Sequence, residues 1–144
     1  MIRFFSTWGW RAGNHRQRRD WLLQCANNKG KEIESLNIIF MRDEELLEMN
    51  QRHLNHDDYT DIITFDLRAR IPQDPIHGEL YISVDRVKEN DRSNGHLLAE
   101  ELDRVMVHGL LHLLGFKDKK EKDKAEMRSA EDACLAVRAW KQQK

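Results

Sequence analysis

Short runs of apolar residues alternate along the chain with longer stretches that repeat apolar residues at helical spacing. The short runs are rich in β-branched and aromatic residues and are bounded by turn-forming residues, which is typical of buried strands. All of them lie in the first part of the chain, so one sheet is expected there. The predicted strands are Ile2–Phe5, Leu36–Met41, Asp61–Leu67 and Glu79–Val84.

The stretches with helical spacing predict the helices. In the first of them, Trp21, Leu22 and Cys25 fall on one face. Another helix is expected after Asp43, whose side chain can cap a helix N-terminus. Glycine readily takes the left-handed conformation, so Gly115 is expected to end the longest helix. The predicted helices are Arg16–Asn28, one beginning near Asp43, Val84–Asp91, His96–Leu114 and Lys119–Trp140.

These elements predict an α+β fold, in which helices pack on a single mixed sheet and His96–Leu114 is a long central helix. The chain has 144 residues, which is the length of one domain of ordinary size. Repeats, linkers and low-complexity tracts are not evident in the sequence. We therefore expect one domain over residues 1–144.

Composition bears on three possibilities: binding of nucleic acid, insertion into a membrane and secretion. Charged residues make up 34% of the chain and the formal net charge is −1, so any binding of nucleic acid must come from a local patch. Apolar runs are shorter than the roughly 20 residues of a membrane span, and the N-terminus lacks the features of a signal peptide. A cytoplasmic protein is expected, in which Cys25 and Cys134 are buried thiols rather than a disulfide or a metal-binding pair.

The segment from His108 to Asp118 carries the most specific chemistry. His108 and His112 are four residues apart, so both imidazoles lie on the same face of a helix. Gly115 releases the chain from the helix, and Asp118 can then turn back to offer a third ligand. Two imidazoles and a carboxylate suit Zn²⁺ or another divalent metal ion and leave a coordination position for water. Water bound in this way can ionise near neutral pH and attack a phosphodiester or an amide.

Two alternatives stay open at this point. A His-x-x-x-His pair can also be two core histidines, although the glycine and aspartate at these offsets favour a metal site. Peptidases with this spacing usually carry Glu directly after the first His as general base, whereas this chain has Gly109. That difference argues against a metallopeptidase and leaves the catalytic base of a hydrolase unassigned.

The sequence HGLLHLLG, from His108 to Gly115, resembles the signature H-G-x-L-H-L-x-G-Y-D-H of the YbeY family of bacterial ribosomal-RNA endoribonucleases. Residues 50–65 resemble a second family pattern, N-x-x-Y-R-x-x-D-x-P-T-(D/N)-V-L-S-F. The positions retained from it are Asn50, Asp57, Thr60, Asp61 and Phe65. Further matches are the strand at 78–83, and Met127 and Glu131 of an M-x-x-x-E pattern. The resemblance covers about residues 36–135.

The chain departs from the family pattern at two functional positions. In register, Asp118 replaces the family's third histidine ligand. If one residue is inserted instead, Asp118 matches the preceding family aspartate and Lys119 takes the place of the histidine. The in-register alignment keeps a metal-competent side chain and is preferred, and an anionic ligand would lower the Lewis acidity of the ion. Leu54 stands where the family has an arginine near the active site.

The resemblance implies a metal-dependent, single-strand-specific endoribonuclease with one Zn²⁺-like ion held by His108, His112 and Asp118. It also implies a role in ribosomal RNA maturation, particularly at the 3′ end of small-subunit RNA, and in ribosome quality control. RNA is then the expected partner, with ribosomal proteins or an assembly GTPase as further partners. The alternatives are a non-catalytic RNA-binding module of ribosome assembly and a zinc peptidase-like hydrolase.

Basic residues near the predicted metal site are candidates for holding phosphates. Lys117 and Lys119 flank Asp118 and are the expected substrate-binding residues, although lysines of a solvated helix start can instead pair with nearby acids. A second basic group near the N-terminus is either a further RNA contact or a solvated face. It consists of Arg11, Arg16, Arg18 and Arg19.

Overall fold

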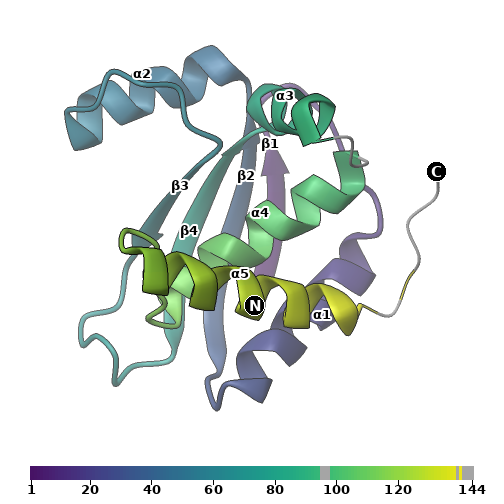
Figure 1. Cartoon of the computed structure of the whole chain (residues 1–144), viewed down its shortest axis with the longest axis vertical. Coiled ribbons are helices and arrows are strands. Elements are labelled where there is room, and N and C mark those ends of the chain that lie inside the picture. Colours follow the sequence, from purple (N-terminus) through teal and green to yellow (C-terminus); the bar gives the residue numbers. More distant parts are fainter. Residues whose placement is uncertain (95–97, 139, 141–144) are drawn as a thin grey trace.

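A computed structural model describes residues 1–94, 98–138 and 140. Within this part of the chain, one four-stranded sheet is flanked by helices, which confirms the predicted α+β class (Figure 1). The strands are β1 (Ile2–Ser6), β2 (Ile33–Met41), β3 (Ile62–Asp66) and β4 (Ile76–Ser83). The helices are α1 (His15–Asn28), α2 (Asp43–Leu54), α3 (Val84–Asn94), α4 (Leu98–Leu113) and α5 (Glu121–Ala136).

The sheet is mixed, and its strand order is β1-β2-β4-β3. β1, β2 and β4 run parallel, and β3 is antiparallel to β4. The order places β1 at one edge of the sheet and β3 at the other. It also brings β3, which precedes β4 in the chain, next to the central helix.

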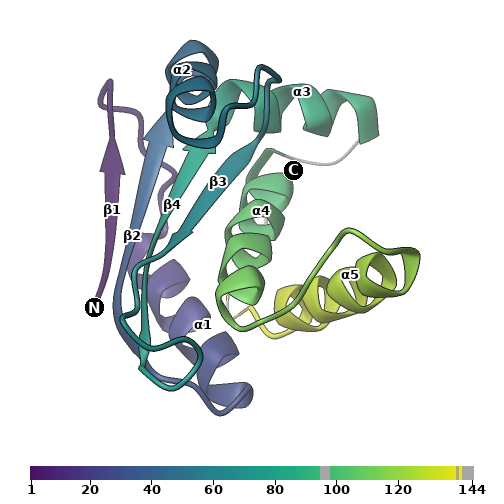
Figure 2. The same cartoon turned by 90° about the vertical axis from the view of Figure 1, so that its left-hand side faces the viewer.

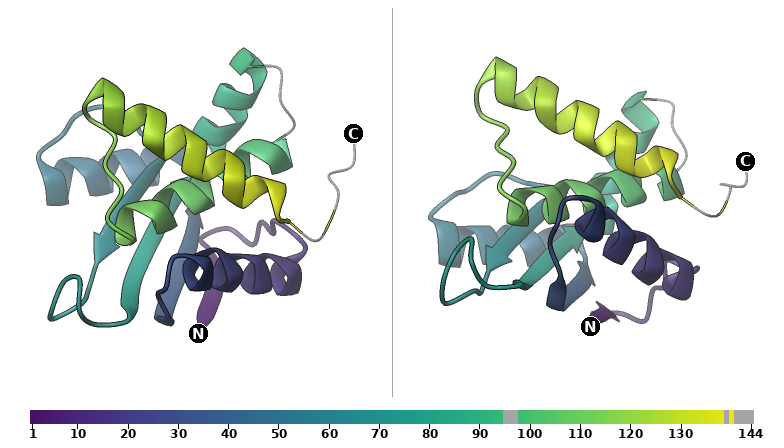
Figure 3. Two further views of the ribbon diagram at one scale, coloured as in Figure 1. Left: turned by 60° about the horizontal axis from the view of Figure 1, so that its bottom comes forward. Right: turned by 90° about the horizontal axis from the view of Figure 1, so that it is seen from below.

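The core lies between the sheet and two helices that cover one of its faces, α1 and α4 (Figures 1 and 2). Ile38 and Leu80 of the sheet, Trp21 of α1, and Met106 and Leu110 of α4 are all almost completely buried. α5 packs on α4 on the side away from the sheet (Figure 3). Since α4 is covered on both sides, its sequence is apolar on more than one face.

The starts of β2, β4 and α2 differ from the predictions. β2 begins at Ile33 and β4 at Ile76, and these two residues pair in the sheet. At the start of α2, Asp43 is not the capping residue. The Glu45 carboxylate instead accepts a hydrogen bond of 2.9 Å from the backbone N–H of Arg42. Asp43 accepts one from the Ser83 hydroxyl at 3.0 Å, so it joins α2 to the end of β4.

Three further expectations concern the helices. The predicted start of the central helix at His96 lies outside the described residues, and α4 is described from Leu98. Cys25 and Cys134 are buried free thiols, as predicted. Among the helices of the described residues, none combines the length and apolarity needed to cross a membrane.

Candidate metal centre

The structure brings the three predicted ligand side chains together beside the C-terminal end of α4. Nε2 of His108 lies 3.1 Å from Nε2 of His112. Oδ2 of Asp118 lies 3.2 Å from Nε2 of His112 and 3.3 Å from Nε2 of His108. One carboxylate oxygen of Asp118 is therefore close to both imidazoles.

The chain reaches this position because α4 ends in a tight turn. Gly115 has a φ of +101°, a left-handed conformation that glycine adopts without strain. The backbone N–H of Gly115 donates to the carbonyl of His112 at 3.0 Å, and that of Phe116 donates to the carbonyl of Leu111 at 3.0 Å. These bonds satisfy the last carbonyls of the helix and turn the chain back, so that Asp118 faces the histidines.

Each imidazole is held through its other nitrogen. Nδ1 of His108 lies 2.6 Å from Oε2 of Glu131, and Nδ1 of His112 lies 3.0 Å from the carbonyl oxygen of Phe116. Both partners accept hydrogen bonds, so each Nδ1 donates, and in the neutral imidazoles each Nε2 keeps a lone pair for an ion. In a tetrahedral zinc site, ligand atoms at the usual bond lengths lie roughly 3.3–3.5 Å apart. The observed donor set, with separations of 3.1–3.3 Å, fits such an ion.

Glu131 of α5 is buried and links the histidine to a second cation. Its Oε1 accepts from Nη1 of Arg104 at 2.8 Å. Burial alone raises the pKa of Glu131, but His108 and Arg104 outweigh it and lower the pKa below its usual value. Burial also lowers the pKa of His108, but Glu131, Asp118 and Asp61 outweigh this effect and raise it. The carboxylate of Glu131 is therefore ionised and orients the imidazole.

The cluster lies on the wall of a cleft of about 910 Å³. Other parts of its lining come from α2, the following loop and β3. They include Asn50, Leu54, Asp58, Tyr59, Asp61 and Asp66. Leu54, which replaces the arginine of the family pattern, is 43% exposed. Burial raises the pKa of Asp61, and the charge of His108 opposes this rise.

Gly109 faces the sheet and not the cleft. A Cβ atom at this position would lie 2.8 Å from Cδ1 of Ile62 and 2.8 Å from Cδ2 of Leu80. A glutamate there would have to fit between α4 and the sheet, so it could not reach water bound near the histidines. The position that carries the general base in a His-Glu-x-x-His peptidase is therefore occupied by packing, and the structure does not favour that alternative.

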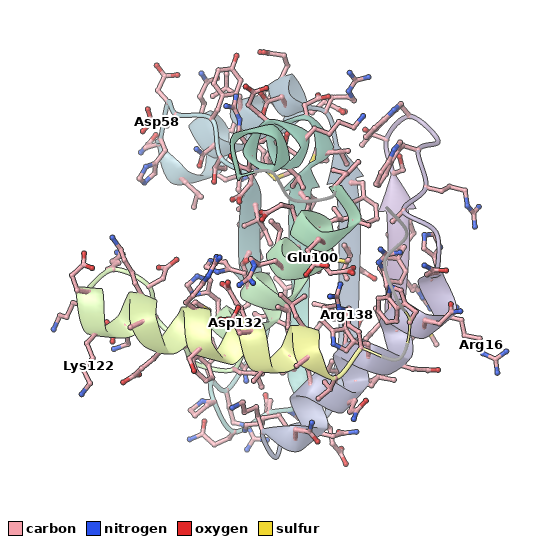
Figure 4. The ribbon with its side chains drawn as sticks, turned by 45° about the vertical axis from the view of Figure 1, so that its right-hand side comes forward. Arg16, Asp58, Glu100, Lys122, Asp132 and Arg138 are labelled. Carbon is pink, nitrogen blue, oxygen red and sulfur yellow. The ribbon has the colours of Figure 1, made fainter. Side chains whose placement is uncertain are left out.

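The two predicted substrate-binding lysines lie on the exposed turn beside Asp118. Lys119 lines the main cleft. Lys117 and Lys119 both line a smaller cavity of about 380 Å³ next to it. In Figure 4, Lys122 lies at the N-terminal end of α5, and Asp58 lies above it in the loop that follows α2. Lys119 and the carboxylates of Asp58, Asp61, Asp66 and Asp118 thus all line the cleft.

One member of the second basic group is not at the surface. Arg18 is 1% exposed, and its Nε donates to Oδ1 of Asp103 at 2.8 Å, so the prediction that it belongs to a basic surface is wrong. Arg11 and Arg16 are exposed, and Arg19 is partly buried. Sequence reasoning also left Glu131 without a role, although its match to the M-x-x-x-E pattern was the available signal.

An α+β fold with two histidines on its central helix and an aspartate on the following turn, beside a large cleft, defines a class of metal-dependent hydrolase. Comparison with known sequences specifies it further. The sequence model of the family described as Endoribonuclease YbeY matches residues 12–138. The chain belongs to this endoribonuclease family.

Individual relatives agree with this assignment. A protein named Endoribonuclease YbeY from Cytophaga hutchinsonii is 48% identical to this chain, over 85% of this chain and 84% of that protein. A protein of the same name from Christiangramia forsetii is 38% identical, over 94% of this chain and 93% of that protein. Among solved structures, the solution structure of TM1509 from Thermotoga maritima matches with a TM-score of 0.66 and 25% identity. That match covers 94% of this chain and 87% of the other.

Proposed function

We propose that this chain is a metal-dependent endoribonuclease that cuts single-stranded RNA and forms one domain over residues 1–144. The observation that carries the proposal is the cluster of His108, His112 and Asp118 beside a cleft of about 910 Å³, in a chain whose relatives are named endoribonucleases. The proposed substrate is ribosomal RNA, at the 3′ end of the small-subunit RNA, with ribosome quality control as a linked role. The proposed location is the cytoplasm.

The proposed metal ligands are Nε2 of His108, Nε2 of His112 and a carboxylate oxygen of Asp118, and the proposed ion is one Zn²⁺ or a similar divalent cation per chain. Such an ion, when bound, polarises a phosphate and activates water for attack. Glu131 and the Phe116 carbonyl hold the two imidazoles in the required tautomer and orientation. The ligands are therefore positioned before the ion arrives, which lowers the cost of binding it.

The proposed role of Lys117 and Lys119 is to hold the phosphates of the RNA strand beside Asp118. Both are exposed, and an ammonium group near a phosphate attracts it and offsets charge that develops during cleavage. The net charge of −1 gives the whole molecule little attraction for RNA. Ribosomal proteins or an assembly GTPase are therefore proposed as partners that bring the enzyme to its substrate.

The alternatives have less support. Gly109 packs against the sheet, which disfavours a peptidase with a glutamate base at that position. A non-catalytic RNA-binding module would not need two imidazoles and a carboxylate within about 3 Å of one another with their outer nitrogens tied down.

The proposal is tested by metal content and RNA cleavage of the chain purified without a histidine tag. We expect about one zinc-like ion per chain, measured by mass spectrometry, and loss of that ion in His112→Ala and Asp118→Ala. Cleavage of a labelled single-stranded RNA should fall by about 100-fold or more in His112→Ala. His53→Ala is the control, because His53 is an exposed histidine outside the cluster.

Two outcomes would contradict the proposal. A His112→Ala variant with a wild-type circular dichroism spectrum and undiminished cleavage would remove the metal mechanism. Absence of metal from the wild type, even after incubation with Zn²⁺, together with RNA binding but no cleavage, would support the non-catalytic alternative.

A further inference from the structure

A second cavity, of about 200 Å³, lies at the β1 edge of the sheet. β2 and β4 separate β1 from β3, which lines the metal cleft, so the two cavities are distinct. The walls of the second cavity are mainly aromatic rings. Phe4 stacks on the His15 imidazole with centroids 4.7 Å apart, and Trp10 meets Phe40 edge to face at 5.2 Å.

The rim of this cavity exposes further aromatic surface. Phe5 is 48% exposed and lines the cavity, and Trp8 is 38% exposed. Trp8 is outside the cavity lining: it stacks on Trp10 with centroids 6.0 Å apart, and the Arg42 guanidinium lies over its ring at 5.1 Å from the centroid. Large aromatic side chains that gather at a protein surface mark a binding site more often than isolated ones do.

The N-terminal segment that supplies most of the cavity lining is rich in arginine. Residues 1–19 contain five arginines and no aspartate or glutamate. Arg18 is paired with Asp103, but Arg3, Arg11, Arg16 and Arg19 have no ion pair among the described residues. Burial lowers the pKa of His15, and the charges of Arg11, Arg18 and Arg19 lower it further. Arg16 extends into solvent from the start of α1 (Figure 4).

The loop that forms one wall is held in place by buried contacts. The Arg18 guanidinium, fixed by Asp103, donates to the backbone carbonyls of Ala12 and Gly13. At the other end of the loop, the backbone N–H of Thr7 donates to the carbonyl of Phe40 at 3.1 Å. Trp10 and Arg11 are therefore carried by a loop that is anchored on both sides, so the cavity exists before any ligand binds.

We propose that this aromatic–arginine site, formed by Phe5, Trp10, Arg11 and His15, binds an unstacked base of single-stranded RNA. Aromatic rings stack on bases of any sequence, and neighbouring arginines pair with the flanking phosphates. The volume is below the roughly 300–1,000 Å³ of sites for whole drug-sized ligands and suits a single ring system.

This site rests on the proposed function in one respect, because it takes RNA to be the substrate. It adds a contact point that the metal centre does not provide. Since two strands lie between the aromatic–arginine site and the cleft, one nucleotide cannot occupy both. An RNA that engages both must be several nucleotides long, so the site favours longer single strands over very short ones.

The test is the binding of a fluorescein-labelled single-stranded oligouridine, followed by anisotropy in the presence of a chelator that prevents cleavage. We expect Trp10→Ala to weaken binding by about 5- to 100-fold, the usual effect of losing one stacking partner. Arg11→Ala should weaken binding and lower the slope of log affinity against log salt by about 0.7. Ile71→Ala and Arg70→Ala are matched controls, since each alters an exposed side chain in another loop, and should bind as the wild type does.

Trp10 packs on Phe40, so its variant could lose structure as well as a ligand contact. Phe5→Ala is therefore a second variant, because Phe5 is exposed and its loss should leave the circular dichroism spectrum unchanged. We expect this variant to weaken RNA binding by at least about 3-fold. Wild-type affinity in both Phe5→Ala and Arg11→Ala would overturn the aromatic–arginine site while leaving the endoribonuclease proposal intact if the wild type cleaves RNA. A wild-type chain that neither binds nor cleaves RNA would reject both proposals.

Discussion

At the scale of single residues, Glu131 is the buried acid that holds one of the proposed metal ligands. It lies on a different helix from the histidines, yet its carboxylate contacts Nδ1 of His108 at 2.6 Å. Arg104 holds the other carboxylate oxygen at 2.8 Å. The side chain is buried, so this ionic chain is fixed in a region of low dielectric, where its orienting effect is strong.

Replacing Glu131 by glutamine keeps the shape of the side chain and removes its charge. We expect Glu131→Gln to weaken metal binding by about 10-fold, because partners of this kind orient the imidazole and raise its basicity. Competition with a chromophoric chelator measures the affinity directly. Asp132→Asn is the matched control, since Asp132 binds the same Arg104 from an exposed position and should bind metal as the wild type does. Equal affinities in the wild type and Glu131→Gln would show that Glu131 does not position the ligand.

The contrast between Glu131 and the other site residues shows what a sequence can predict. The spacing of His108 and His112 is sufficient to place both on one helix face, and Gly115 indicates the turn that returns Asp118. Glu131 becomes a neighbour of His108 only because α5 crosses α4, which no local pattern encodes. The same limit applies to Arg18, whose partner Asp103 is distant in sequence.

At the scale of elements, the end of α4 is joined to β3 by one buried arginine. Nη2 of Arg68 donates to the carbonyl of Leu113 at 2.7 Å, and its Nε donates to Oδ1 of Asp66 at 2.9 Å. A cation at a helix C-terminus is favourable, because the last carbonyls have no partner within the helix. This contact fixes the position of the helix end from which the proposed metal-binding turn departs.

The pairing of Asp66 with Arg68 predicts a dependence of stability on pH. The Arg68 guanidinium lowers the pKa of Asp66. Such a carboxylate stabilises the fold above its unfolded pKa of about 3.9, and this stability is lost as the pH falls through the lower folded value. We therefore expect Asp66→Asn to be less stable at pH 7 by about 1–2 kcal/mol and to lose less stability on acidification.

Urea denaturation between about pH 5 and pH 2 measures both effects. Asp74→Asn is the comparison, because its partner Arg70 has a side chain that is 77% exposed and such pairs contribute little. An identical loss of stability on acidification in the wild type and Asp66→Asn would contradict this account.

At the scale of the whole molecule, charge is separated although the net charge is −1. Arginines gather at the β1 edge, lysines lie on the turn after α4, and carboxylates line the cleft between α2 and β3. The α+β class could be predicted from the sequence, because short apolar runs indicate strands and apolar residues at helical spacing indicate helices. The sequence did not define the strand order, because pairing between β2 and β4 is a contact between distant segments.

The lysines predict how RNA binding responds to salt. We expect replacement of both Lys117 and Lys119 by alanine to lower the slope of log affinity against log salt by up to about 1.4, because each phosphate contact on a single strand contributes about 0.7. Anisotropy titrations at several salt concentrations, in the presence of a chelator, measure the slope. Lys31→Ala is the control, since its ammonium group contacts the carbonyl of Pro72 away from the cleft. An unchanged slope in the double variant would place the phosphate contacts elsewhere.

The turn that carries Asp118 has a consequence for how this protein can evolve. The two histidines belong to a helix packed on both sides, so exchanging either disturbs the site and its surroundings together. Asp118 follows the helix on an irregular segment, and its side chain is 39% exposed. A mutation there alters the donor atom offered to an ion while leaving the hydrophobic packing unchanged. If Asp118 is the third ligand as proposed, selection can retune the preference for one metal over another at this codon alone, without a compensating change in the rest of the fold.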